Sequence, residues 1–144
     1  MVNTENIDEA KELIRKSRNP IIIEAKSSDF NRKILDYGKF NIISGLEYTK
    51  EKSSLQNINS GLNEILAKIA KKNDISIGID LGKIKNLEKK EKAEVLTKIK
   101  QNIIICRKTK TKIKVLNYNN KMSASSLLFS LGASSQQVKE AVSF

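Results

Sequence analysis

The chain has 144 residues, enough for one domain with a sizeable hydrophobic core. It carries 27 basic against 16 acidic residues, a net charge of +11, and this excess favours a polyanionic partner such as nucleic acid. It has no histidine and a single cysteine, which excludes histidine-based catalysis, an intramolecular disulfide and nearly every zinc site.

The N-terminal residues lack the apolar segment of a signal peptide, and no apolar stretch approaches membrane-spanning length. We therefore expect a cytoplasmic, reducing location and no membrane partner. Cys106 falls on the apolar stripe of an expected helix, which is typical of a small core residue.

The first third of the chain alternates helical and strand patterns. We expect one helix capped by Thr4 and another over residues 29–37 capped by Asp29. The apolar runs at 21–23 and 40–44 are typical of strands covered on both faces in a parallel sheet. The polar stretch from Gly45 to Asn59 is interpreted as a loop.

The remainder continues the same alternation. Apolar residues from 62 to 69 share one helix face, residues 75–80 and 112–117 predict strands, and residues 82–88 are expected to form a loop. A long helix between these strands has an inner face of Val95, Leu96, Ile99, Ile103 and Cys106. Ile104 and Ile105 fall off that face and are candidate partner contacts. Two closing helices are expected over 123–131 and 134–142, the first ended by Gly132.

Strands separated by helices of this length predict an α/β fold with right-handed crossovers and a parallel sheet. About four to five strands make half of a (β/α)₈ barrel, so we expect a reduced or half TIM-barrel-like architecture in a single domain, 1–144. An open half-barrel would leave two sheet edges bare, which predicts a partner subunit or a homodimer.

Polar side chains collect at the expected carboxyl ends of the strands: Glu24, Lys26, Ser27, Ser28, Asp80, Lys83, Tyr118, Asn119, Asn120 and Lys121. None is a candidate base with a neighbouring group suited to tune its pKa, so we expect no catalytic residue and no metal site. A carboxylate-dependent metal enzyme using Glu24 and Asp80 is the remaining enzymatic hypothesis.

Basic residues converge at the opposite end of the expected sheet: Arg15, Lys16 and Arg18; Lys71 and Lys72; Arg107, Lys108, Lys110 and Lys112. Helix dipoles explain one or two lysines per helix end, but less easily the run R-K-T-K-T-K at 107–112. We interpret Arg107, Lys108, Lys110, Lys71 and Lys72 as RNA-binding, with Lys68 and Lys121 as weaker candidates. Because lysine binds phosphate as a point charge, contact with the RNA backbone is favoured over base readout.

The stretch Asn59-Ser60-Gly61 has three interpretations. Ser60 as a helix N-cap, with Asn63 three residues on, resembles a capping box. A phosphate-binding helix N-terminus and a catalytic role are the alternatives. Cap and packing are favoured, because a phosphate-binding loop would show more glycines.

Two segments, SGLNEILAKIAKKNDISIGIDL and KAEVLTKIKQNIIICRKTKTKIKVLN, together resemble the archaeal ribonuclease P protein component 3 family, relatives of the eukaryotic p30 subunit. The C-terminal segment SLLFSLGASSQQVKEAVS is similar to the C-terminal motif of the family. The resemblance is weak over 1–58 and strong over 59–144, as in a member truncated at the N-terminus. Ser60, Gly61 and Asn63 lie in its most recognisable motif.

The resemblance implies a non-catalytic subunit of a tRNA-processing ribonucleoprotein, whose RNA performs the 5′ maturation of precursor tRNA with Mg²⁺. The protein itself would hold no cofactor. Its implied partners are ribonuclease P RNA, a small α/β protein subunit of the same enzyme, and precursor tRNA indirectly, in a homodimer or heterotetramer. The family's fold is akin to PHP-type phosphoesterases, which bind metals through histidines that this chain lacks. The alternative function is a homodimeric half-barrel scaffold without RNA-specific binding.

Overall fold

The computed structural model describes residues 1–50 and 59–143. Its centre is a parallel sheet of four strands in the order β1 (Ile22–Glu24), β2 (Ile42–Ser44), β3 (Ser76–Asp80) and β4 (Ile113–Leu116). The register aligns Ile23 with Ile43, Ile43 with Ile77, and Ile77 with Ile113, so one row of isoleucines crosses the sheet. This arrangement confirms the predicted α/β fold with a parallel sheet.

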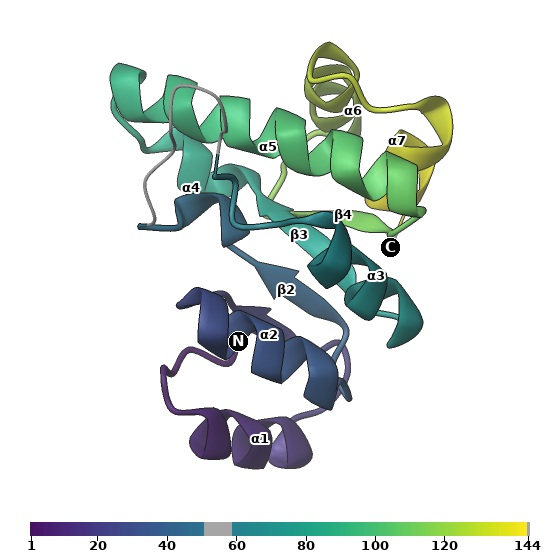
Figure 1. The fold of residues 1–144 in the computed structure, drawn as a ribbon. Coiled ribbons are helices and arrows are strands. Elements are labelled where there is room, and N and C mark those ends of the chain that lie inside the picture. Colours follow the sequence, from purple (N-terminus) through teal and green to yellow (C-terminus); the bar gives the residue numbers. More distant parts are fainter. Residues whose placement is uncertain (51–58, 144) are drawn as a thin grey trace.

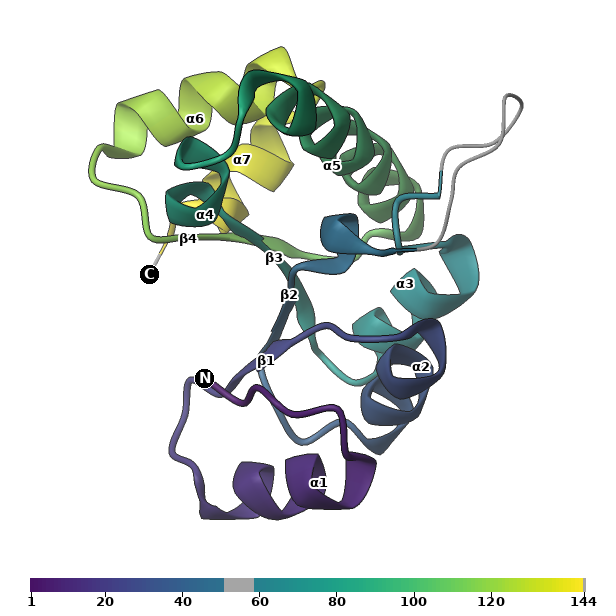
Figure 2. The same cartoon turned by 90° about the vertical axis from the view of Figure 1, so that its left-hand side faces the viewer.

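Helices connect the strands and wrap around one side of the sheet. They are α1 (Ile7–Lys16), α2 (Ser28–Tyr37), η1 (Leu46–Tyr48), α3 (Glu64–Lys72), α4 (Leu81–Lys85), α5 (Lys89–Thr109), α6 (Lys121–Ser130) and α7 (Ser135–Ala141) (Figure 1). Turned by 90°, α1, α2, α3 and α5 form an arc around the strands, and both termini lie on the open side (Figure 2). The architecture is therefore half TIM-barrel-like, as the sequence predicted. None of the described helices is long and apolar enough to span a membrane.

A continuous cluster of buried apolar residues fills the space between the sheet and the helices. Ile23, Ile43 and Val115 are completely buried there, and burying a side chain of this size contributes about 1.5–3 kcal/mol. On α5 the predicted inner face is buried except for Leu96, which is half-buried. Burial raises the pKa of the Cys106 thiol to about 12, which suits an inert core residue.

The two outer strands are covered rather than bare. Val2 pairs in parallel with β1: its N–H donates to the Ile22 carbonyl (2.8 Å), and its carbonyl accepts from Glu24 N–H (2.9 Å). At the other side α7 packs on β4, Val115 is 0% exposed, and Lys114 Nζ donates to the carbonyls of Glu140 and Ser143. The predicted pair of bare edges is wrong for the described residues, so the edges give no argument for a partner.

Several helix ends differ from prediction because a cap must directly precede the first helical turn. Asn6, not Thr4, caps α1, and Ser27, not Asp29, caps α2. The expected loop over 82–88 begins as α4, since the Asp80 carboxylate accepts from Lys83 N–H (3.2 Å) and starts a helix there. The first closing helix begins at Lys121, two residues early, because Asn120 caps it.

Two further expectations are only partly met. Within the expected loop from Gly45 to Asn59, residues 46–48 form the short helix η1, while 51–58 lie outside the described residues. Ile104 is 53% exposed as expected, but Ile105 is half-buried and packs against the core. Of these two residues, Ile104 is the more exposed.

Candidate nucleic-acid interface

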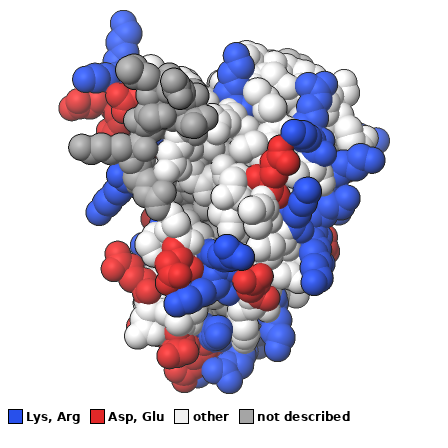
Figure 3. Space-filling view, in the orientation of Figure 1, with Lys and Arg blue, Asp and Glu red and all other residues white. Residues whose placement is uncertain are grey.

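The ends of α3 and α5 lie together because each crossover helix runs antiparallel to the strands and finishes where the next strand begins. The two helices pack against each other, and both carry basic residues in their last turns. The exposed cations of this region are Lys68, Lys71 and Lys72 from α3 and Arg107, Lys108 and Lys110 from α5 and its C-cap. We call these six residues the α3–α5 basic surface. Lys and Arg side chains gather over this part of the molecule, on the right of Figure 3.

Two buried threonines hold the lysine-rich turn between α5 and β4 in place. Thr111 Oγ1 donates to the Ala67 carbonyl on α3 (2.8 Å) and lies 2.8 Å from Thr109 Oγ1, which bonds the Ile105 carbonyl. Threonines buried at 109 and 111 alternate with exposed Lys108, Lys110 and Lys112. The run R-K-T-K-T-K is thus anchored to α3 through its threonines and presents its cations to solvent. Sequence reasoning missed these anchors, although their alternation with the lysines was a visible signal.

An acidic residue sits within the basic surface. Glu64 Oε1 of α3 is 2.7 Å from Lys108 Nζ of α5. The hydrogen bond from Lys108 lowers the pKa of the Glu64 carboxyl, and the same bond raises the pKa of Lys108. Both side chains are well exposed (47% and 69%), so solvent screens the pair. Lys108 is therefore paired with a carboxylate, whereas Lys71, Lys72 and Lys110 have no partner among the described residues.

Not all predicted cations join this surface. Arg15, Lys16 and Arg18 belong to the end of α1, which packs on α2 rather than on α3. Lys121 is the first residue of α6, after the carboxyl end of β4, and so lies at the opposite end of the sheet. The structure brings together the ends of α3 and α5, and within α5 Lys108 contacts α3 whereas Arg107 Nη1 donates to the Gly132 carbonyl after α6 (3.5 Å).

The stretch around Gly61 packs the interior and does not cap a helix. Ser60 is 1% exposed, and its carbonyl accepts from Asn102 Nδ2 of α5 (3.2 Å). Gly61 has φ +81°, and a Cβ there would lie 1.9 Å from the Leu46 carbonyl oxygen. The N-cap of α3 is Asn63, whose Oδ1 accepts from Leu66 N–H (2.9 Å). Ser60 as N-cap is thus wrong, because the tight passage past Leu46 delays the helix by three residues.

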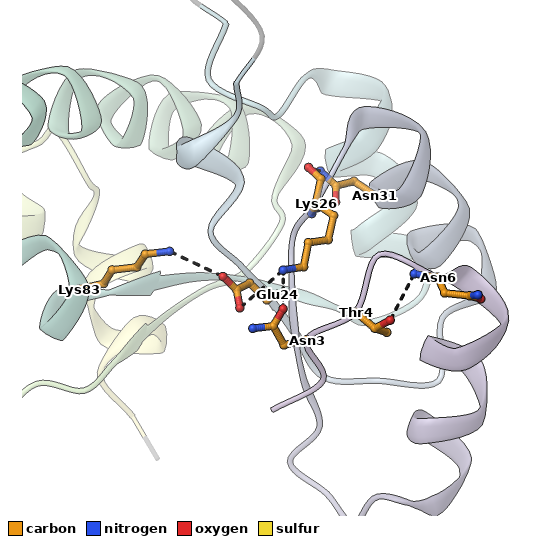
Figure 4. A network of polar contacts seen from close by, with 7 residues as sticks. All are labelled: Asn3, Thr4, Asn6, Glu24, Lys26, Asn31 and Lys83. Atoms are coloured by element: carbon orange, nitrogen blue, oxygen red, sulfur yellow. Dashed lines mark hydrogen bonds and ion pairs between the residues drawn. The ribbon is translucent and has the colours of Figure 1, made fainter.

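At the carboxyl ends of the strands, charged side chains neutralise one another. The Glu24 carboxylate lies 4.0 Å from Lys26 Nζ and 3.7 Å from Lys83 Nζ, and Lys26 also bonds the Asn3 side chain (Figure 4). Lys83 Nζ stands 4.1 Å from the centre of the Tyr48 ring. The other predicted carboxylate, Asp80, caps α4. Two ammonium groups beside Glu24 disfavour a divalent cation, and no group of three or more metal-ligating side chains occurs among the residues described.

A curved parallel sheet wrapped by helices, with cations concentrated at the ends of two neighbouring helices, defines a basic protein of the half TIM-barrel-like class. Its fold is similar to that of one chain in a structure described as "cryo-EM structure of archaeal Ribonuclease P with mature tRNA". The TM-score is 0.79 over 96% of this chain and 61% of that chain, at 20% identity.

Curated relatives agree with this similarity. The chain is 24% identical over 115 residues to ribonuclease P protein component 3 of Methanococcus maripaludis strain C6, covering 78% of this chain and 47% of the relative. It is 26% identical over 111 residues to the same component of Methanococcus vannielii, covering 75% and 45% respectively. The resemblance found in the sequence is confirmed: the chain is a relative of the ribonuclease P protein component 3 family.

The similarity has a defined extent. The chain spans about half the length of the curated relatives that it matches. No family model matches it.

Proposed function

We propose that this chain is a non-catalytic protein subunit of ribonuclease P that binds the catalytic RNA through the α3–α5 basic surface. One observation carries the proposal: α3 and α5 pack against each other and carry six exposed cations in and beside their last turns, where Thr111 bonds to α3. The names of the curated relatives supply the identity of the RNA.

The surface is suited to phosphates rather than to bases. Five of its six cations are lysines, which act as point charges and lack the planar fork that reads a base edge. Each phosphate that they neutralise releases condensed counterions, so binding should weaken steeply as salt increases. In this role the protein stabilises the shape of the RNA, and the RNA with its Mg²⁺ performs the 5′ maturation of precursor tRNA.

The remaining partners belong to the same proposal. The chain, acting as one α/β domain in the cytoplasm, would contact a small α/β protein subunit of the enzyme and meet precursor tRNA only through the RNA. The protein itself would need no cofactor for this function. Lys121, remote from the α3–α5 basic surface, would contribute little to RNA affinity.

Substituting both Arg107 and Lys108 by Ala tests the surface directly. Two lost phosphate contacts should lower the slope of log K against log salt by about 1.4–1.8 and weaken binding to ribonuclease P RNA about tenfold or more at low salt. The measurement is a titration of labelled RNA at several salt concentrations, with an unrelated structured RNA as competitor.

The matched control is Lys89→Ala with Lys90→Ala, an exposed pair at the other end of the same helix. It removes the same net charge but lies roughly 27 Å away at 1.5 Å per helical residue. If both double variants lose affinity equally, only the net charge matters and the α3–α5 basic surface is not the site. If the unrelated RNA competes as well as ribonuclease P RNA does, the proposed RNA specificity is wrong.

A further inference from the structure

A second surface, unrelated to the basic one, is an apolar groove between α4, α5 and α6. Its volume is about 650 Å³, and its apolar lining comprises Leu81 and Ile84 from α4, Leu96 from α5, and Leu127 from α6. Leu81, Leu96 and Leu127 remain partly exposed, and Leu81 and Leu96 also pack against the core. We call this the α4–α6 groove. Its volume is within the range of pockets that enclose several apolar side chains.

Two of the polar residues that line the groove are engaged within the protein. Tyr118 lines the groove, and its hydroxyl donates to the Val142 carbonyl (3.0 Å). Asn120 Oδ1 accepts from Met122 N–H (2.9 Å) and Ser123 N–H (3.1 Å) and so caps α6. With Leu81, Ile84, Leu96 and Leu127 in its lining, the groove also suits apolar side chains.

The charged residues that line the groove are all basic. Lys85 and Lys92 are part of its lining, and no carboxylate is. Neither ammonium group has an ion pair or hydrogen bond among the described residues. A ligand that fills the groove with apolar side chains would therefore gain by placing carboxylates at its margins.

We propose that the α4–α6 groove binds an amphipathic helix of a partner protein, with an apolar stripe in the groove and acidic residues beside Lys85 and Lys92. Helices recognise such grooves through apolar residues at positions i, i+3 or i+4, and i+7. A second copy of this chain is a poorer occupant, because it would bring a further net charge of +11.

The groove and the basic surface lie toward opposite ends of α5. Lys92 and Lys108 are separated by roughly 24 Å at 1.5 Å per helical residue, so a bound helix leaves the basic surface open. The inference does not depend on RNA binding, and a partner and an RNA could be bound together.

Synthetic helical peptides provide the test. The first carries a leucine stripe flanked by glutamates, the second the same stripe flanked by lysines, and the third a scrambled order of the first. We expect fluorescence anisotropy to show that the acidic amphipathic peptide binds at least about tenfold more tightly than either of the others.

Two variants and one control then locate the binding. Leu127→Gln should weaken the acidic peptide about tenfold by making the groove floor polar. Lys85→Glu with Lys92→Glu should reverse the preference in favour of the lysine-flanked peptide, without touching the core. Phe129→Ser, on the same helix and 51% exposed but outside the groove, should change nothing.

Any other pattern overturns the proposal. Equal binding of the three peptides, or no binding, shows that the groove does not select an acidic amphipathic helix. A loss with Phe129→Ser as large as that with Leu127→Gln places the binding elsewhere on α6. An unchanged preference after the charge reversal removes Lys85 and Lys92 from recognition.

Discussion

The segment around Gly61 and the turn from Arg107 to Lys110 both belong to the family-like part of the chain, yet they are held by different forces. Around Gly61 every feature is internal: a buried serine, a glycine against the Leu46 carbonyl, and a bond from Asn102. In the turn from Arg107 to Lys110, by contrast, Thr109 is buried and the three cations are exposed to solvent. One family-like motif therefore serves the packing of the interior, whereas another forms part of the charged surface.

Because of this difference, we expect substitutions in the two segments to affect different measured properties. Substitutions around Gly61 should change the free energy of unfolding and leave the chemistry of the surface intact. Substitutions among the exposed cations should change RNA affinity and leave stability nearly unaltered, because exposed charges contribute little to folding. The experiments below test this division.

Gly61→Ala should have the largest effect on stability. The new Cβ would overlap a carbonyl oxygen at 1.9 Å, and a φ of +81° is itself unfavourable for alanine. We expect a loss of roughly 3–4 kcal/mol in urea denaturation. The matched control is Gly132→Ala, where φ is +95° but nothing lies within 4 Å of the added atom. It should cost only about 1 kcal/mol, and equal losses would contradict the steric argument.

Glu47, next to Leu46 on η1, extends the buried region and makes it sensitive to pH. The side chain is 2% exposed and its Oε1 has no hydrogen-bond partner. Burial raises the pKa of its carboxyl from 4.5 to about 7, although nearby Lys83 opposes the change. Because the folded state holds the proton more tightly, this contribution to stability is complete below pH 4.5 and is lost as pH rises through about 7.

The variant Glu47→Gln should remove this pH dependence. We expect the free energy of unfolding of this variant to lack the decline between pH 4.5 and 7 and to exceed that of the wild type by about 3 kcal/mol at alkaline pH. Chemical denaturation at a series of pH values provides the measurement. A parallel decline in both proteins would show that another group is responsible.

Asn102→Ala should produce a loss of about 2 kcal/mol, because it leaves the buried Ser60 carbonyl without its donor. The neighbouring exposed Lys100 provides the comparison, since Lys100→Ala should change stability by no more than about 0.5 kcal/mol. Similar losses in the two variants would mean that the Asn102 bond does not stabilise the segment.

Glu64→Gln should have the smallest effect on folding and a measurable effect on binding. The substitution frees Lys108 from its carboxylate partner and removes one negative charge from the basic surface. We expect affinity for ribonuclease P RNA to rise about threefold at low salt. Unchanged affinity would show that Lys108 does not contact the RNA.

Much of the fold was predictable from local pattern. All four strands were predicted to within two residues at each end, the first two because continuous apolar runs are typical of a doubly covered parallel sheet. The inner face of α5 followed from helical spacing, and the helix expected over 134–142 is α7, which Ser134 caps. Helix starts were less accurate, because several polar residues precede each helix and only one has the geometry of a cap.

The sequence predicted that the candidate surface would be basic, but it did not show which residues would be neighbours on it. Helix ends that precede strands of one parallel sheet must share one side, which placed Lys71, Lys72, Arg107 and Lys108 together. Sequence spacing could not show that α2 separates α1 from α3, nor that Glu64 faces Lys108. Both depend on which helices become neighbours across the sheet.

The sequence by itself determined the fold class, the absence of histidine chemistry and the excess of positive charge, since these follow from periodicity and composition. Only the tertiary structure decided the role of Gly61, because its close neighbour, Leu46, lies 15 positions earlier in the chain. Tertiary structure likewise covered the outer strands with Val2 and α7, and left an apolar groove beside α4. Such contacts join residues distant in sequence, and local pattern carries no information about them.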